Sequence, residues 1–350
     1  MTIYLLNLFS IPFYVFFLRC VFFTEEKQRR WLCWIVGIQL FLTAALRNIS
    51  VGGDLENYIP AFKYIGELSW KELVFVPFET GYVVLNKVVF VLSQNVQLLL
   101  VIIGGFVVFG YVRMIYQNSV LPWVSLLFFI GLGFFTESLS MLRQAIAMVI
   151  FIYGLKYVVT REFGKYLLIV LLAASFHLTA IVALLLYPFV RFRLNVCNFI
   201  IIFIGCGVLA LFMGPFVLDY IISHFYSLYS SQMDSGGGSS MLILLLAVTI
   251  GVLLLWKKRE DNWENLFVHM LVLACCMQLF ALQFALFARI VMYFSMSMII
   301  CVPNMLVKIE NKEFRFLATS VACLLAVVYF IFIILGRNAA GIAPYYFMWE

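Results

Sequence analysis

Residues 316–335, FLATSVACLLAVVYFIFIIL, run for 20 positions without a charged side chain. A helix rises about 1.5 Å per residue, so this run is long enough to cross the roughly 30 Å hydrocarbon core of a bilayer. The whole 350-residue chain is of the same kind, with 65% hydrophobic residues, 11% charged residues and a mean hydropathy of +1.08. A soluble protein of this composition would lack a polar surface. The sequence therefore predicts an all-α, polytopic integral membrane protein.

About twelve apolar segments are visible, and several are shorter than the roughly 20 residues of a simple crossing. We expect about 10–12 transmembrane helices, some broken or re-entrant, in one membrane domain that covers residues 1–350. The connections between the segments are too short to form a soluble domain. The segments are 3–23, 31–46, 82–92, 98–112, 123–135, 139–159, 166–190, 197–222, 241–256, 266–284, 290–306 and 316–335.

Basic connections set the expected orientation. Lys and Arg collect in residues 25–30, 156–165, 257–264 and 308–315, which the positive-inside rule assigns to the cytoplasm. This assignment places both termini, residues 47–80 and the turn near Arg289 on the outer side. The Ser/Gly-rich stretch 223–240 has no Lys or Arg and is also expected outside.

In the middle of the chain, the number of apolar segments does not agree with the sides assigned to the basic connections. If residues 156–165 and 257–264 are both cytoplasmic, one of the three segments between them fails to cross. Segment 166–190 is the best candidate, because small and polar residues interrupt it at 173–177. Segment 123–135 is short and carries Gly131 and Gly133. Broken helices are tolerated in a membrane where they line a water-filled cavity. Segments that fail to cross therefore indicate a polar cavity. The alternative is that one basic loop lies outside.

Several functional classes are excluded. The sequence has neither a phosphate-binding P-loop nor a dinucleotide-binding glycine fingerprint. The eight cysteines fall in apolar runs without metal or redox spacing, so no metal and no cofactor are expected. The net charge of +6 is spread over short loops, which does not indicate nucleic-acid binding.

Ionisable residues inside or at the ends of apolar segments are the functional candidates, because a charge at bilayer depth is expensive. The first group lies in residues 47–58, RNISVGGDLENY, and presents Arg47, Asp54 and Tyr58 together. Arg suits phosphate, since its planar fork bonds two oxygens at once. The alternative is an ordinary loop with an interfacial Arg.

A second group contains Glu137, Arg143 and Gln144. On one continuous helix, Ser140, Arg143 and Gln144 would fall near a single face and form a polar patch at the entrance of a span. The alternative is an ion pair between Arg143 and Glu137 that joins two helices.

Three further positions complete the set. His177 lies at the expected helix break, although a core histidine bonded to a carbonyl is the common alternative. Arg289 and Tyr293 are four residues apart and share one helix face. Tyr345, in the tail, either anchors at the interface or packs against a sugar.

Arg47, Arg143 and Arg289 can all converge on the outer side. Three Arg side chains around one cavity favour a diphosphate ligand, whereas a cation transporter would show converging carboxylates.

The order of these short motifs resembles a known family. Arg47, Gly53-Asp54 and Tyr58 come first, then Arg143-Gln144 and Phe176-His177; Arg289 with Tyr293 and Pro344-Tyr345 follow. This pattern resembles the EpsG family of Wzy-like O-antigen and exopolysaccharide polymerases, although Gly-Gly-Asp replaces a commoner Val-Gly-Asp-like run. The resemblance covers nearly the whole chain.

The resemblance implies a GT-C-like glycosyltransferase of the bacterial inner (plasma) membrane. Such an enzyme joins undecaprenyl-diphosphate-linked oligosaccharide repeat units at the outer face of the membrane. The implied partners are the lipid bilayer, the lipid-linked oligosaccharide, a chain-length regulator and a flippase, and no nucleic acid.

The reaction suggests a division of roles. Fixed Arg donors stabilise the leaving diphosphate in a water-poor site, and the acceptor hydroxyl benefits from one base. We expect Arg47, Arg143 and Arg289 to bind the diphosphate. The remaining expected roles are Asp54 or Glu137 as base, His177 as an orienting group, and Tyr58, Gln144, Tyr293 and Tyr345 as substrate contacts.

Two other functions stay open. A lipid-linked oligosaccharide flippase would need polar residues along both halves of the membrane, whereas these residues crowd the proposed outer face. A membrane acyltransferase modifying exported polysaccharide would need a His with a neighbouring acid, and the sequence around His177 contains none.

Overall fold

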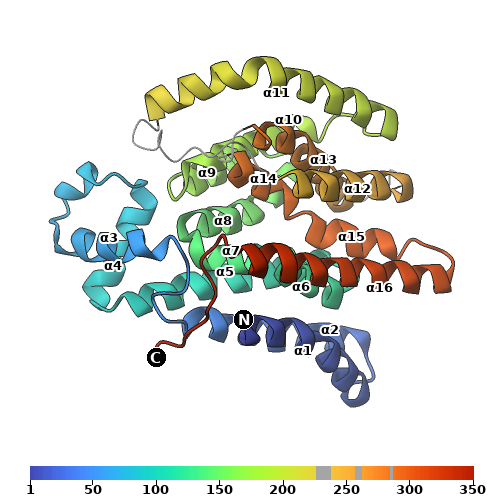
Figure 1. Cartoon of the computed structure of the whole chain (residues 1–350), viewed down its shortest axis with the longest axis horizontal. Helices are drawn as coiled ribbons and strands as arrows, with labels where there is room; N and C mark the ends of the chain where they lie inside the picture. The colour runs from blue at the N-terminus through green and yellow to red at the C-terminus, as the bar shows by residue number, and fades with distance from the viewer. Residues whose placement is uncertain (226–237, 257–261, 284–286) are drawn as a thin grey trace. The chain divides into compact units, whose positions relative to one another are not determined.

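The computed structural model describes residues 1–225, 238–256, 262–283 and 287–350 (Figure 1). Within these ranges the chain is helical and contains no β-strand; a lone antiparallel bridge joins Arg47 to Phe347. The prediction of an all-α polytopic protein is confirmed. The expected loop at 223–240 and the basic connection at 257–264 lie largely outside the described residues.

The helices follow one another with short connections. In chain order they are α1 (Thr2–Val21), α2 (Glu25–Ala45), α3 (Leu55–Glu67), the 3-10 helix η1 (Glu72–Phe75), α4 (Thr80–Leu92), α5 (Val96–Asn118), α6 (Pro122–Gly131), α7 (Phe134–Ser140), α8 (Leu142–Val159), α9 (Phe163–Ala174), the 3-10 helix η2 (Leu178–Leu185), α10 (Leu186–Phe189), α11 (Val196–Phe225), α12 (Ser239–Leu255), α13 (Asn262–Ala281), α14 (Phe287–Ser295), α15 (Met298–Leu306), α16 (Lys312–Tyr329) and the π-helical turn η4 (Phe330–Leu335).

Helices of two lengths account for the apolar segments. In the described part of the chain, six helices are long and apolar enough to cross a membrane: α1, α5, α8, α13, α14 with α15, and α16 with η4. The pair α6 and α7, bent by 45°, makes a seventh if it is one broken span. Five further apolar helices are shorter, as the sequence predicted for several segments.

Both expected helix breaks are present. Between α6 and α7, Gly133 has φ +87°, and a Cβ there would lie 2.7 Å from the Ile334 side chain. Glycine is therefore required for conformation and for space. The second break separates α9 from η2 at residues 175–177, within the interrupted stretch of segment 166–190. The predicted broken segments are confirmed.

A third break was not predicted. Segment 139–159 was expected to be one helix, but α7 ends at Ser140 and α8 begins at Leu142, with Met141 (ψ 65°) between them. Ser140 and Gln144 therefore do not share a helical turn, and that expectation is wrong. The break frees the Leu139 carbonyl from the helical ladder, and the Arg47 side chain donates to it instead.

The chain divides into two compact units, each described by itself. The first comprises Met1–Leu155, Gly164–Ile181 and Ile309–Glu350; in it α2 packs against α1 and α5, and α16 packs against α6. The second comprises Lys156–Phe163 and Val182–Lys308, where α13 packs against α11, α12 and α14.

Candidate active site

Arg143, at the start of α8, is the centre of a polar cluster in the first unit. Its Nη1 donates to Glu79 Oε2 at 2.5 Å, and its Nε donates to the Tyr58 hydroxyl at 3.3 Å. The Glu79 Oε1 atom lies 3.4 Å from His177 Nδ1 and accepts from the Leu178 N–H at 3.2 Å. The cluster therefore joins four regions that are distant in sequence.

Close backbone contact places Glu79 beside His177. Glu79 precedes α4, and two residues later the Gly81 N–H donates to the Ser175 carbonyl at 2.7 Å. A Cβ at position 81 would lie 2.5 Å from Ser175 Oγ and 2.8 Å from its carbonyl oxygen. Only glycine allows this approach, so the start of α4 and the break after α9 are held together.

The Glu79 carboxylate is ionised despite its surroundings. Burial raises the pKa of Glu79, but the bond to His177, the positive charge of Arg143 and the Leu178 N–H outweigh burial and hold the pKa at about 2. At neutral pH Glu79 is therefore an anion that fixes a cation on one side and an imidazole on the other.

Aromatic rings surround the Arg143 guanidinium. Its Cζ lies 4.9 Å from the Phe78 ring centroid and 5.6 Å from that of Tyr58, distances that allow cation–π attraction. Tyr82 packs against both rings, with centroids at 6.0 and 5.4 Å. Even so, the Arg143 side chain is 19% exposed, and its hydrogen bonds to Glu79 and Tyr58 use two of its five N–H donors, so an incoming ligand can reach it.

Arg47 has a different setting. It is 1% exposed, and its guanidinium donates to the Ala44 carbonyl at 3.2 Å and the Leu139 carbonyl at 3.0 Å. These carbonyls lie at the C-terminal ends of α2 and α7, where the helix dipoles are negative. Burial lowers the pKa of Arg47 to about 10, so it stays charged at neutral pH. The side chain fastens two helix ends.

The loop after Arg47 is held by the C-terminal tail (Figure 1). The Gly52 and Gly53 N–H groups donate to the Gly341 and Ala340 carbonyls at 2.9 and 2.8 Å. Gly52 has φ +122°, and a Cβ there would lie 2.6 Å from the Leu139 carbonyl oxygen. The Gly-Gly pair thus serves backbone packing within the protein.

Asp54 and Glu137, the two predicted bases, lie near this junction. The Asp54 N–H donates to Ser140 Oγ at 3.1 Å, and its side chain is partly exposed at the start of α3. Glu137 is partly exposed on α7. The carboxylate that pairs with Arg143 is Glu79 and not Glu137, so the proposed Arg143–Glu137 pair is wrong.

The other predicted contacts are spread more widely. Gln144 is buried next to Arg143 on α8. The Tyr345 hydroxyl donates to the Thr43 carbonyl at 2.9 Å, and its ring meets Tyr4 edge-on at 5.6 Å. Arg289 and the fully buried Tyr293 lie on α14 in the second unit, so their convergence with Arg143 stays a prediction.

The profile of the EpsG family matches residues 30–347. The chain belongs to the EpsG family. The match includes every residue of the Arg143 cluster and nearly the whole chain. It confirms the resemblance found in the motifs and supports a Wzy-like polymerase role for this EpsG chain. Comparison with curated proteins and with solved structures found no match.

Sequence reasoning missed Glu79 in this EpsG chain. Residue 79 stands in a short connection, VPFETGY, that looks like an ordinary loop before a helix. One signal was available: a glycine two residues after the Glu, at the start of an apolar helix, marks a close backbone approach. His177 has no acid near it in the sequence, but the fold supplies Glu79 from 98 positions away. Among the described residues, no group of three or more His, Cys, Asp or Glu side chains is placed to hold a metal ion.

Proposed function

We propose that this EpsG chain joins polyprenyl-diphosphate-linked oligosaccharide repeat units, with undecaprenyl diphosphate as the lipid carrier, and that the Arg143 cluster is its reaction site. The observation that carries the proposal is the arrangement of one accessible guanidinium, one anchoring carboxylate and one imidazole within a single group of contacts. Arg143 would bind the diphosphate leaving group, and His177 would accept the proton of the attacking sugar hydroxyl.

Leaving-group stabilisation follows from the position of Arg143. Negative charge grows on the diphosphate as its bond to the anomeric carbon breaks. The guanidinium is already held by Glu79 and by the Tyr58 and Phe78 rings, so it need not reorganise when that charge appears. Arg143 also stands at the start of α8, where the helix dipole is positive and favours an anion. Both effects favour a diphosphate.

Proton removal suits His177 better than the two predicted carboxylates. Glu79 orients the ring through Nδ1 and stabilises the imidazolium that forms when the ring accepts a proton. In the proposed step an acceptor sugar hydroxyl attacks the anomeric carbon, its proton passes to Nε2 of His177, and the lipid diphosphate leaves. Glu79 is itself a weak base because its pKa is near 2. Asp54 and Glu137 remain alternative bases.

Arg47 supports the site without touching the substrate in this proposal. By joining the ends of α2 and α7 it fixes the chain just before Arg143. The positive-inside pattern supports a location of the cluster at the outer face, with both termini outside. Exported repeat units delivered by a flippase would meet it there, and a chain-length regulator would act on the growing product.

A complementation assay tests the proposal. Arg143→Ala, Glu79→Gln and His177→Ala are expressed in a strain that lacks this gene, and surface polysaccharide is separated by length on a gel. Arg113→Ala is the matched control, because Arg113 is exposed on α5 and, among the described residues, contacts the Tyr153 ring and no residue of the Arg143 cluster. Long chains should disappear in the first three variants and persist in the control, with membrane expression equal in all four.

The products that remain distinguish the alternatives. Single repeat units outside the cell mean that polymerisation fails after export, as a polymerase requires. Repeat units retained inside would point to a flippase. Full-length chains that lack acyl groups would point to an acyltransferase, for which the Glu79–His177 pair would then be the relevant feature. Normal long chains in all variants would refute the site.

A further inference from the structure

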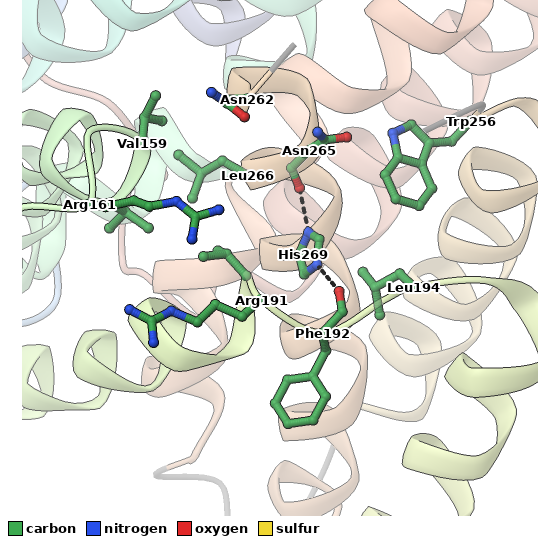
Figure 2. A pocket seen from close by; sticks show the side chains of 12 residues that line it. Val159, Arg161, Arg191, Phe192, Leu194, Trp256, Asn262, Asn265, Leu266 and His269 are labelled. Carbon is green, nitrogen blue, oxygen red and sulfur yellow. Dashed lines mark hydrogen bonds between the residues drawn. The ribbon is translucent and has the colours of Figure 1, made fainter. Parts of the chain in front are cut away.

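A second polar cavity lies entirely within the second unit, in the part of the chain that contains none of the proposed reaction residues of the Arg143 cluster (Figure 2). It encloses about 290 Å³ between the end of α8, the segment after α10 and the start of α13. Arg161, Arg191, Trp256, Asn262 and His269 are the polar residues that matter for its chemistry. Valine and leucine side chains, with Phe192 and Asn265, complete the walls.

Arg161 occupies a position where helices favour glycine. The Glu162 N–H bonds to the Tyr157 carbonyl at 2.9 Å and the Arg161 N–H to the Val158 carbonyl at 3.3 Å, which is the Schellman pattern that ends a helix. The residue at this point needs a left-handed backbone, and Arg161 has φ +61°. The Tyr187 hydroxyl holds the strained turn by donating to the Arg161 carbonyl at 2.8 Å.

The left-handed backbone at Arg161 places its positively charged side chain in the wall of the cavity. In Figure 2 the Arg161 guanidinium points towards Leu266 and His269. Arg191 also lines the cavity, but in Figure 2 its guanidinium points away from His269, and its Cζ lies over the Tyr187 ring at 5.4 Å. Neither guanidinium has a carboxylate partner within the ranges that the structure describes. A helix end that carries an arginine where glycine is favoured breaks a local rule, which is typical of functional positions.

Two buried rings, His269 and Trp256, form the floor. His269 lies between two carbonyl oxygens, with Nδ1 2.6 Å from that of Asn265 and Nε2 3.0 Å from that of Phe192. The Trp256 indole stands edge-on to His269, and its Nε1–H is buried without a partner among the described residues. A buried N–H without an acceptor calls for a ligand that supplies one.

We propose that this cavity binds a phosphate group carried by a small organic substituent, as in the headgroup of an anionic phospholipid. Arg161 would bind the phosphate oxygens and Arg191 would add positive charge at the rim of the cavity, while Trp256 Nε1 and the Asn262 amide would meet the hydroxyl-bearing substituent. The volume is at the low end of the range for ligand pockets, which suits a headgroup. The positive-inside pattern assigns this basic end to the cytoplasmic leaflet. The inference does not rest on the polymerase proposal.

Lipid binding to the purified, delipidated full chain tests the inference, measured by native mass spectrometry with phosphatidylglycerol or phosphatidylcholine. We expect selective retention of phosphatidylglycerol. Arg161→Gly should weaken that retention by at least about tenfold, because it removes a charged donor while fitting the left-handed turn without strain. Arg191→Gln should act in the same direction. Arg193→Gln is the matched control, since Arg193 is exposed on the same segment but does not line the cavity.

Competition separates the sources of the phosphate. Displacement of phosphatidylglycerol by glycerol phosphate or by inorganic phosphate supports a site for any small phosphate, and failure of both to displace it supports a lipid headgroup site. Equal retention of the two lipids, or unchanged retention in a folded Arg161→Gly variant, would overturn the inference. Arg143→Ala should bind phosphatidylglycerol like the unmodified chain, so the result is independent of whether the polymerase site is correct.

Discussion

Arg47 and Arg143 come from the same predicted set and lie on either side of the same helix junction, yet their surroundings differ in kind. Arg47 is sealed from solvent and its donors serve the carbonyls at two helix ends. Arg143 is held by a carboxylate and by aromatic rings, and it keeps part of its guanidinium exposed. One arginine is built into the fold, whereas the other is held ready for a ligand.

The comparison shows that an arginine at the end of a span is not by itself a substrate contact. Its partners decide the role. Backbone carbonyls at helix ends need a donor in every conformation, so an arginine bonded to them has a structural task. A carboxylate fixes the direction of a guanidinium without using all of its donors, so an arginine paired in this way can still bind an anion.

The largest expected effect is on Arg47. Replacing it with alanine removes a buried donor from two carbonyls and leaves a cavity, which should destabilise the fold by about 3–5 kcal/mol. Folded protein in detergent, measured by size-exclusion chromatography, should fall sharply. If Arg47→Ala instead folded normally and lost only polymer synthesis, the structural role assigned to Arg47 would be wrong.

Arg143→Ala should have the opposite pattern. The protein should fold in near-normal yield while the rate of chain elongation falls by about 10²- to 10³-fold, the usual effect of losing one preorganised charge donor. Arg143→Lys keeps the charge but not the planar fork, so it should recover only part of the rate. Elongation of a lipid-linked repeat unit in proteoliposomes provides the measurement. Full activity of the lysine variant would contradict a two-oxygen contact.

Gly81→Ala tests the contact that brings Glu79 to His177. The added methyl would press on the Ser175 carbonyl, so we expect a loss of about 1–3 kcal/mol in stability and reduced elongation. Gly164→Ala is the matched control. A Cβ at Gly164, in α9, meets nothing within 4 Å, so alanine there should be neutral or stabilising. Similar thermal unfolding midpoints for the two variants would argue against the close approach at Gly81.

The Glu79 carboxylate predicts a pH dependence. Its pKa is about 2 in the folded protein against an ordinary value of 4.5, so the ionised group stabilises the fold above pH 4.5. This stabilisation, on the order of 3 kcal/mol, should fade as the pH drops from 4.5 towards 2. Unfolding in detergent should show this loss of stability. Glu79→Gln should be less stable than the unmodified chain at neutral pH, but its free energy of unfolding should change less between pH 4.5 and 2. Parallel pH profiles would count against the ion pair.

A small effect is expected at Tyr345. Tyr345→Phe removes the bond to the Thr43 carbonyl and should cost about 0.5–1.5 kcal/mol of stability. Elongation at saturating substrate should stay within about twofold if the hydroxyl only anchors the tail. A large rise in KM without a change in stability would support the original prediction that Tyr345 contacts the sugar.

The helical architecture was predictable because apolar length and charge placement act locally. Gly131 and Gly133, and the polar interruption before His177, marked real breaks for the same reason. The break at Met141 was not predictable, since nothing in residues 139–142 disfavours a helix. It depends on Arg47, which is distant in sequence and donates to the carbonyl that the break exposes.

The site was predictable in part. Arg143, His177 and Tyr58 were selected because polar residues are costly near a bilayer, and the structure joins them through contacts. Glu79 was missed because a Glu in a connection between helices carries no such cost; only the glycine at position 81 indicated a close contact there. The different role of Arg47 was equally hidden, because an arginine bonded to carbonyls and one paired with a carboxylate look alike in sequence.

The most direct test of the central claim measures elongation rate and folded yield together for Arg143→Ala and Arg47→Ala, with Arg113→Ala as control. Each protein is reconstituted with the same polyprenyl-diphosphate-linked repeat unit. We predict that Arg143→Ala gives folded protein that does not elongate, that Arg47→Ala gives little folded protein, and that Arg113→Ala is normal in both. Folded Arg143→Ala protein that elongates at the unmodified rate would contradict the assignment of the reaction site.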